Sequence, residues 1–186
     1  AMGIFFLSEY IEVLIFGSKW AGVGRVIAFI AIVQGWSWFA TGINYEAYRA
    51  IGRPDIFPKL MIFSLLYYLP VYFYFAPKGL DVFLWARLFL VFMSFPLHIW
   101  ILCRFLQVSP FLLWQQSKVS WMATFVMAIV LFTATQYIVP LHENWIKQSA
   151  SLGFLILLGG FTYVAVVAIL DREFICEIKE MVLKMI

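Results

Sequence analysis

The feature that most constrains this fold is a long stretch with almost no charge. Between Leu60 and Leu170 only seven residues are Asp, Glu, Lys or Arg. The whole chain of 186 residues is 65% hydrophobic, with a mean hydropathy of +0.95, whereas soluble domains are about 45–50% apolar. A charge at the bilayer centre costs at least about 2.5–3.5 kcal/mol, so this sparsity fits a membrane. The sequence therefore predicts an all-α, polytopic membrane helical bundle.

Six apolar segments predict five to six transmembrane helices, since one crossing takes about 20 apolar residues. The four strong segments are Val23–Ile43, Leu60–Pro77, Val82–Leu106 and Val119–Val139. A fifth is Ser149–Leu170, and the sixth, which is short and weak, is Met2–Gly17. The polar extension Asn44–Gly52 continues the first strong segment without a break. Gly52 and Pro54 then end that helix, because glycine accepts a positive φ and proline disfavours helix at the residue before it.

The chain is expected to divide into a transmembrane bundle over residues 1–170 and a tail over residues 171–186. Apolar residues of the tail recur at helical spacing, and charged residues occupy the other face. The tail is therefore predicted to be an amphipathic helix on the inner leaflet, with partner binding as the alternative.

The distribution of basic residues predicts the orientation. One side of the membrane would carry Arg49, Arg53, Lys59, Arg104, Lys118, Arg172, Lys179 and Lys184. The other side would carry Lys19, Arg25, Lys78, Arg87 and Lys147. The richer side is expected to be cytoplasmic, which places the Gly42–Lys59 turn and the C-terminus in the cytoplasm.

Several function classes find no support in the sequence. It has no Gly-rich phosphate loop, HExxH motif or nucleophile elbow, so no catalytic residue, cofactor or metal is predicted. Cys103 and Cys176 form neither a metal nor a redox motif. The net charge of +3 is small and dispersed, and no nucleic-acid partner is expected.

Arginines inside the apolar segments are the first candidates for a binding role. Arg87 lies roughly 8 Å into its segment at 1.5 Å per residue. It either snorkels to the interface or faces a water-filled cavity and an anionic substrate. Arg25 lies closer to the start of its segment, where snorkelling is the simpler role. His98, alone in the third strong segment, is interpreted as a packing histidine.

Two polar lines complete the candidates. Glu9 and Glu12 share a helix face and suggest a polar lumen. A second line runs at offsets of three, four and three through Gln34, Ser37, Thr41 and Asn44. This line either forms hydrogen bonds between packed helices or forms a cavity wall that binds sugar hydroxyls. Pro70 and Pro96 are expected to kink their helices, and Gly159–Gly160 to allow close helix packing.

Two stretches carry a family resemblance. EYIEVLIFGSKWAGVGRVIAFIAI, from Glu9, resembles a segment of the bacterial polysaccharide flippases, in which an apolar helix ends in a Phe-Gly-x-x-Trp turn. NYEAYRAIGRPDIFPKL, from Asn44, is similar to the next segment, in which a long helix ends in an Ala-x-Gly-Arg-Pro-like turn. These are the O-antigen, or lipid-linked oligosaccharide, flippases of the MOP exporter superfamily. Beyond Leu60 only the spacing of the segments agrees.

The resemblance implies that the chain is the C-terminal part of a transporter built from two helical bundles. Such a protein would move lipid-linked oligosaccharide across the bacterial inner, or cytoplasmic, membrane by alternating access, during export of O-antigen, capsule or exopolysaccharide. The substrate-binding residues would come from Arg87, Arg25, Gln34, Asn44, Glu9 and Glu12. Its partners would be the lipid bilayer, the substrate and an N-terminal bundle.

Two alternatives remain open. A membrane-embedded acyltransferase or glycosyltransferase acting on lipid-linked sugars would need His98 in one pocket with an arginine or an acid. A small structural membrane protein would need no such pocket.

Overall fold

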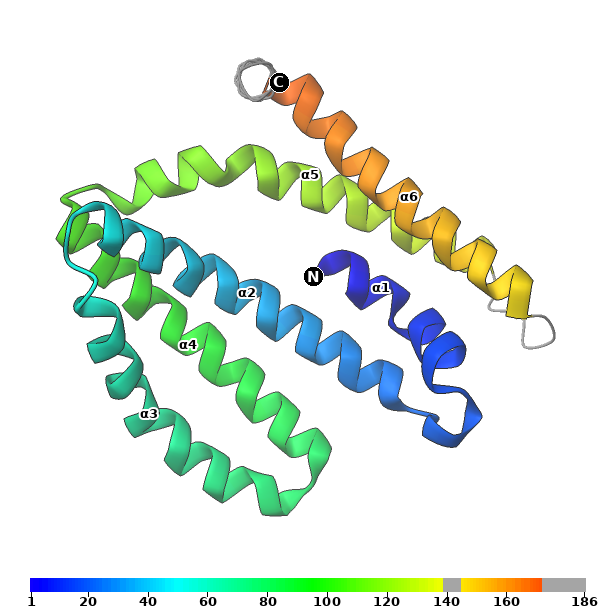
Figure 1. The fold of residues 1–186 in the computed structure, drawn as a ribbon, viewed down its shortest axis with the longest axis horizontal. Helices are drawn as coiled ribbons and strands as arrows, with labels where there is room; N and C mark the ends of the chain where they lie inside the picture. The colour runs from blue at the N-terminus through cyan, green and yellow to red at the C-terminus, as the bar shows by residue number, and fades with distance from the viewer. Residues whose placement is uncertain (139–144, 172–186) are drawn as a thin grey trace. The chain divides into compact units, whose positions relative to one another are not determined.

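The computed structural model describes residues 1–138 and 145–171, and every regular element in these ranges is helical. Four elements are long and apolar enough to cross a bilayer (Figure 1): Ile56–Lys78, which is α3 (Ile56–Phe75) with the short 3-10 turn after it, α4 (Leu80–Leu106), α5 (Pro110–Tyr137) and α6 (Trp145–Leu170). The long helix α2 (Val23–Ala50) adds a shorter apolar stretch, Val23–Trp38. The predicted all-α polytopic membrane fold is confirmed.

Three helices begin four or more residues earlier than the apolar segments predicted, and α4 begins at Leu80 rather than Val82. α3 begins at Ile56 rather than Leu60, α6 at Trp145 rather than Ser149, and α5 at Pro110 rather than Val119. Proline suits the first position of a helix, because its φ is already helical and its missing N–H needs no partner there. The amide of Leu112 also donates to the hydroxyl of Ser109 at 3.3 Å. Each of the three added stretches contains a lysine together with proline or glutamine, which lowers its mean hydropathy, so a composition-based boundary falls inside the helix.

The weak N-terminal segment is interrupted. α1 (Met2–Ile11) continues into a five-residue π-helix (Glu12–Phe16), and Gly17 then takes a φ of 68°. α1 alone is about 15 Å long at 1.5 Å per residue, half of the roughly 30 Å hydrocarbon thickness. The expected sixth span is therefore not a continuous helix of spanning length.

The described residues form two compact units. The first contains Ala1 and Phe29–Leu113, which is most of α2 with α3 and α4. The second contains Met2–Ala28, α5 from Trp114 and α6. The single bundle expected over residues 1–170 stays a prediction, and the predicted amphipathic tail lies outside the described residues.

In the first unit α2 and α4 run parallel and meet through aromatic pairs. The rings of Phe29 and Trp85 are 5.0 Å apart, and those of Trp36 and Phe92 are 4.5 Å apart. α3 runs back along α4, where Tyr72 meets Phe83 at 5.1 Å. α4 therefore contacts α2 at two levels and contacts α3 near the turn that joins them.

The turn between α2 and α3 closes one end of this unit. Gly52 takes a φ of 71°, its amide donates to Arg49 O at 3.0 Å, and the amide of Arg53 donates to Tyr48 O at 2.8 Å. This is the Schellman pattern that ends helices at glycine. The turn brings Ile56 onto Tyr48 and Leu102 in a buried cluster.

The second unit packs α1 and α6 against α5. Leu7, Tyr10, Leu131 and Leu155 are buried together, and the hydroxyl of Tyr10 donates to the backbone oxygen of Ile138. A Cβ on Gly159 would lie 3.1 Å from Leu131 Cδ1. The close helix approach expected at the glycine pair is therefore confirmed for Gly159.

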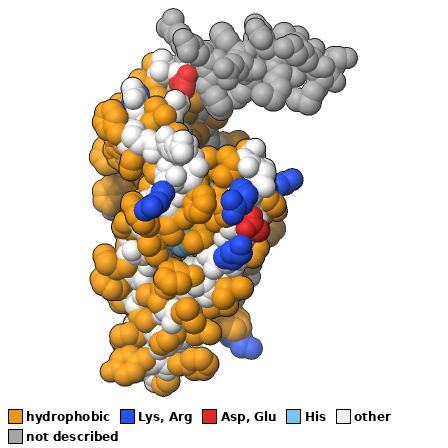
Figure 2. Space-filling model, turned by 90° about the vertical axis from the view of Figure 1, so that its left-hand side faces the viewer, with side chains coloured by type: hydrophobic (Ala, Val, Ile, Leu, Met, Phe, Trp, Pro, Cys, Tyr) orange, Lys and Arg blue, Asp and Glu red, His pale blue; other side chains and the backbone are white. Residues whose placement is uncertain are grey.

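Much of the helical surface is apolar. Hydrophobic side chains cover most of the face in Figure 2, and several large ones are more than two thirds exposed: Leu66, Phe73, Phe125, Leu157 and Phe161. Water-soluble monomers rarely expose so much apolar area. Lipid is a suitable environment for these apolar side chains. The helices also suit a bilayer because their backbone polar groups are paired within each helix.

Candidate functional site

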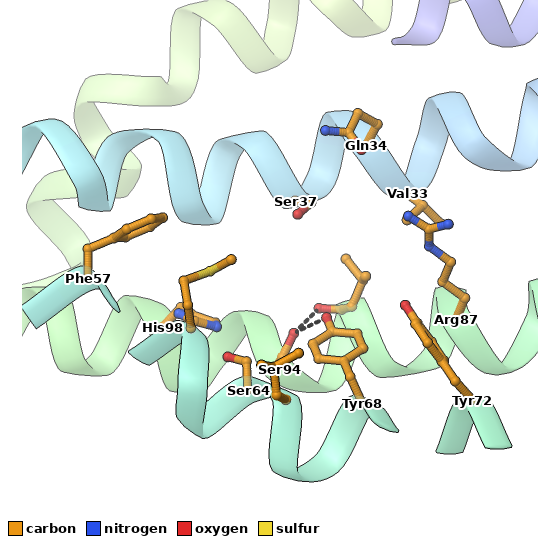
Figure 3. Close-up of a pocket in the computed structure, with 13 residues that line it drawn as sticks. Val33, Gln34, Ser37, Phe57, Ser64, Tyr68, Tyr72, Arg87, Ser94 and His98 are labelled. Carbon is orange, nitrogen blue, oxygen red and sulfur yellow. Dashed lines mark hydrogen bonds between the residues drawn. The ribbon is translucent and has the colours of Figure 1, made fainter. Parts of the chain in front are cut away.

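The first unit contains a cavity of about 330 Å³ between α2, α3 and α4 (Figure 3). Its size lies at the lower end of ligand pockets, about 300–1,000 Å³. The polar lining residues are Gln34, Ser37, Ser64, Tyr68, Tyr72, Arg87, Ser94 and His98. Apolar lining residues are Val33, Phe57, Met61, Leu65 and Val91. A mixed lining of this kind suits a ligand with a polar group and an apolar part.

Arg87 is the one charged residue among the thirteen that line the cavity. Its side chain extends from α4 toward Val33 on α2, and the hydroxyl end of Tyr72 points to the same region (Figure 3). Arg87 Nε is buried and has no hydrogen-bond partner in the described part of the chain. A guanidinium held in this way favours an anion, because an ionised acceptor makes a stronger hydrogen bond than a neutral one.

A group of hydroxyls forms the middle of the cavity. The Tyr68 and Ser94 hydroxyls are 3.3 Å apart, and Ser94 also donates to Val91 O at 3.1 Å. On α3 the hydroxyl of Ser64 donates to Leu60 O at 2.9 Å. Each hydroxyl keeps acceptor capacity beyond these contacts, so the group can accept hydrogen bonds from a ligand.

Both prolines expected to kink their helices lie inside the helices that line the cavity. Pro70 falls between Tyr68 and Tyr72 on α3, and Pro96 falls between Ser94 and His98 on α4. A proline removes a backbone hydrogen bond within its helix. The cavity therefore lies beside the positions at which α3 and α4 lack a backbone hydrogen bond and bend most easily.

The structure brings together two of the predicted binding residues. Arg87 and Gln34 both line the cavity, so the cavity-facing alternative for Arg87 is the one that agrees with its position. Ser37 from the same polar line also lines it. Asn44 is only 1% exposed and does not line the cavity.

The other predicted residues lie in the second unit. Glu9 and Arg25 are exposed. Glu12 binds backbone: its Oε1 accepts from Gly22 N at 2.7 Å, and its Oε2 accepts from Gly24 N. The carboxylate therefore holds the first turn of α2, and a substrate role for these three residues stays a prediction.

The α3 wall of the cavity was not predicted from the sequence. Ser64, Tyr68 and Tyr72 recur every four residues, which places them on one helix face. On α4, Arg87, Ser94 and His98 are also separated by helical spacings of seven and four. These two stripes could have been found by the same periodicity that identified the line on α2.

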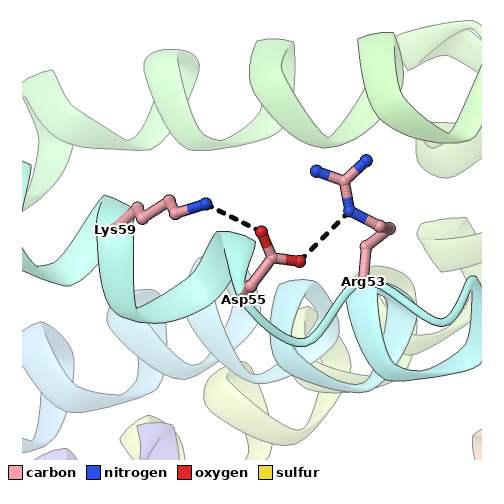
Figure 4. Close-up of polar contacts among 3 residues, drawn as sticks. All are labelled: Arg53, Asp55 and Lys59. Atoms are coloured by element: carbon pink, nitrogen blue, oxygen red, sulfur yellow. Dashed lines mark hydrogen bonds and ion pairs between the residues drawn. The ribbon is translucent and has the colours of Figure 1, made fainter.

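The basic turn between α2 and α3 is partly neutralised. Asp55 pairs with Arg53 at 3.1 Å and with Lys59 at 2.8 Å (Figure 4), and Glu46 pairs with Arg49 at 3.7 Å. Hydrogen bonds from Lys59 and Arg53 lower the pKa of Asp55 to about 2. Three cations and two anions leave this turn with a small positive charge.

The described residues contain no cluster of three or more potential metal-binding side chains. Comparison with protein-family models, with curated proteins and with solved structures gives no match to this chain.

Proposed function

We propose that this chain is the helical-bundle part of a membrane transporter, and that the α2–α3–α4 cavity binds the phosphate-bearing end of a lipid-linked oligosaccharide. The observation that carries the proposal is Arg87, whose buried Nε lacks a partner within the described ranges and which lines the cavity. Its planar guanidinium can grip a phosphate through two parallel hydrogen bonds.

The lining supports an amphiphilic substrate. Met61 and Leu65 belong to the cavity wall and are 48% and 51% exposed, so the cavity borders the apolar exterior of α3. A lipid chain can lie along that exterior while its polar end enters between the helices. Hydroxyls of Ser64, Tyr68 and Ser94 can then bind the sugar next to the phosphate.

The two prolines support movement rather than chemistry. Proline removes a backbone hydrogen bond and makes a helix easier to bend, and Pro70 and Pro96 lie within the cavity-lining parts of α3 and α4, where bending could accompany gating of the site. On this proposal the chain works in the bacterial cytoplasmic membrane, with its basic turn and C-terminus in the cytoplasm. An N-terminal bundle would supply the other half of the transport path.

A membrane-embedded transferase is the second candidate, because Arg87 and His98 line one cavity as that alternative requires. Two features favour transport. The two residues are eleven positions apart on α4, about 16 Å at 1.5 Å per residue, which is too far to act on one reacting atom. In addition, none of the lining residues is a carboxylate.

One experiment on the full-length parent protein in proteoliposomes distinguishes transport of the substrate from a transferase reaction on it. A fluorescent polyprenyl-pyrophosphate-linked sugar is supplied in one leaflet, and its movement and its covalent structure are both measured. We expect movement of unchanged substrate, reduced at least tenfold by Arg87→Ala and little affected by Arg104→Ala, an exposed arginine outside the cavity. A new covalent product that depends on His98 would instead establish the transferase.

A further inference from the structure

Asn44 and Tyr48 form a buried polar pair on α2. They are one turn apart, so they share a helix face, and their exposed fractions are 1% and 0%. Tyr48 packs with Ile56 and Leu102, and its ring meets that of Phe105 edge-on at 6.0 Å. The pair therefore lies inside the first unit, away from its lipid-facing surface.

Three polar atoms of this pair have no hydrogen-bond partner in the described residues: Asn44 Nδ2, Asn44 Oδ1 and the Tyr48 hydroxyl oxygen. Proteins rarely leave buried polar groups unsatisfied, and an unexplained case commonly marks an ordered water or ion. Internal waters typically make about three hydrogen bonds to such groups. The two side chains offer that number of contacts within one helical turn.

We propose that Asn44 and Tyr48 hold an internal water molecule between α2, α3 and α4. Water is the ligand that matches both side chains, because it accepts from Asn44 Nδ2 and donates to Asn44 Oδ1 or to the Tyr48 oxygen. A cation would leave Nδ2 without an acceptor, and an anion would leave Oδ1 without a donor. This site is separate from the Arg87 cavity and does not depend on the proposed transport function.

The alignment of α2 with α4 indicates the level along the helices at which the proposed water would lie. Trp36 meets Phe92, and Tyr48 meets Leu102 and Phe105. Asn44 lies between these two contacts on a parallel helix and so falls near the level of His98 to Leu102 on α4. The water would thus fill the packed end of the three-helix unit, close to the turn that joins α2 to α3.

Thermal unfolding of the full chain in nanodiscs tests the water site, because the direction of the change in Tm on Tyr48→Phe differs with and without a bound water. If the Tyr48 hydroxyl binds water, Tyr48→Phe removes a hydrogen bond and lowers the Tm by about 2–4 °C. If the hydroxyl is unsatisfied, the same change removes a buried polar atom at no cost and leaves the Tm unchanged or higher, which would overturn the proposal. Tyr45→Phe is the matched control, because Tyr45 lies on the same helix and is 40% exposed.

Two further measurements keep the proposal testable if a variant folds poorly. X-ray radiolysis generates hydroxyl radicals from bound water, so wild-type Tyr48 should be oxidised although it is inaccessible to bulk solvent. An unmodified Tyr48 beside a modified Tyr45 would contradict the water.

Sodium and choline test whether the site holds a cation instead of water. If the wild-type Tm rises with sodium but not with choline, and this response is lost in Asn44→Leu, the bound species is a cation and the proposal is overturned.

Discussion

The carboxylate of Glu12 holds the backbone of Gly22, whose amide donates to Glu12 Oε1 at 2.7 Å. The other oxygen accepts from the Gly24 amide, so one side chain satisfies two of the unpaired donors at the start of α2. A helix start leaves about four such donors, and a carboxylate there also interacts favourably with the helix dipole. This contact fixes where α2 begins.

Loss of the Glu12 carboxylate should destabilise the chain. Glu12→Ala is expected to lower the free energy of unfolding by about 1 kcal/mol, the usual effect of removing a helix cap. Reversible urea unfolding in mixed micelles measures the change. Glu9→Ala is the matched control, since Glu9 is exposed on the same segment; an equal loss in both variants would rule out the capping role.

The neighbouring glycines of α6 should respond differently to alanine. A Cβ on Gly159 would lie 3.1 Å from Leu131 Cδ1, whereas a Cβ on Gly160 would meet nothing within 4 Å. Alanine is favoured over glycine inside a helix by about 0.5–1 kcal/mol. Gly160→Ala should therefore be neutral or stabilising and Gly159→Ala should be the less stable variant by thermal unfolding. The reverse order would contradict the packing of α6 on α5.

The ion pairs of Asp55 should persist under mild acid. The folded pKa of about 2 lies below the ordinary aspartate pKa of 3.8, so the stabilisation is present above pH 3.8 and is lost as the pH falls through 2. Carboxyl-carbon NMR of ¹³C-labelled aspartate in micelles should show this low midpoint. In Lys59→Gln the midpoint should rise toward the ordinary value, and an unchanged midpoint would exclude the Lys59 contact as a cause.

The orientation predicted from basic residues can be tested by labelling. A single cysteine replacing Ile51, an exposed residue of the α2–α3 turn, is introduced after Cys103 and Cys176 have been changed to serine. An impermeant maleimide should leave it unlabelled in intact cells and label it in inverted membrane vesicles. Labelling in intact cells would place the turn outside and reverse the proposed topology.

Sequence predicted the helical class and most helix ends because bilayer burial leaves a strong pattern. Val23, Leu106 and Leu170 mark helix boundaries at the residues where the apolar segments begin or end. The starts of α3, α5 and α6 were missed, because their first turns are polar or contain proline. The π-helix at Glu12–Phe16 was also missed, since no simple periodicity identifies one.

The candidate site was only partly predictable. Arg87 and Gln34 stand out in an apolar background and were identified. Tyrosine and serine are common in membrane helices, so Tyr68, Tyr72 and Ser94 do not stand out in the sequence. They form one lining only when α3 packs against α4. The capping contact of Glu12 depends on a chain reversal at Gly17 and Gly22, both with positive φ, whereas its helix-face spacing from Glu9 had suggested a polar lumen.

Binding of a polyprenyl pyrophosphate to the chain in nanodiscs tests the central claim most directly. Fluorescence titration should show that Arg87→Ala raises the Kd by tenfold or more, since a hydrogen bond to a charged group contributes about 1.5–3 kcal/mol. Arg87→Lys should retain part of the affinity, because it keeps the charge but loses the planar fork, and Arg104→Ala should bind as the wild type does. Wild-type affinity in a well-folded Arg87→Ala would contradict a phosphate site in the α2–α3–α4 cavity.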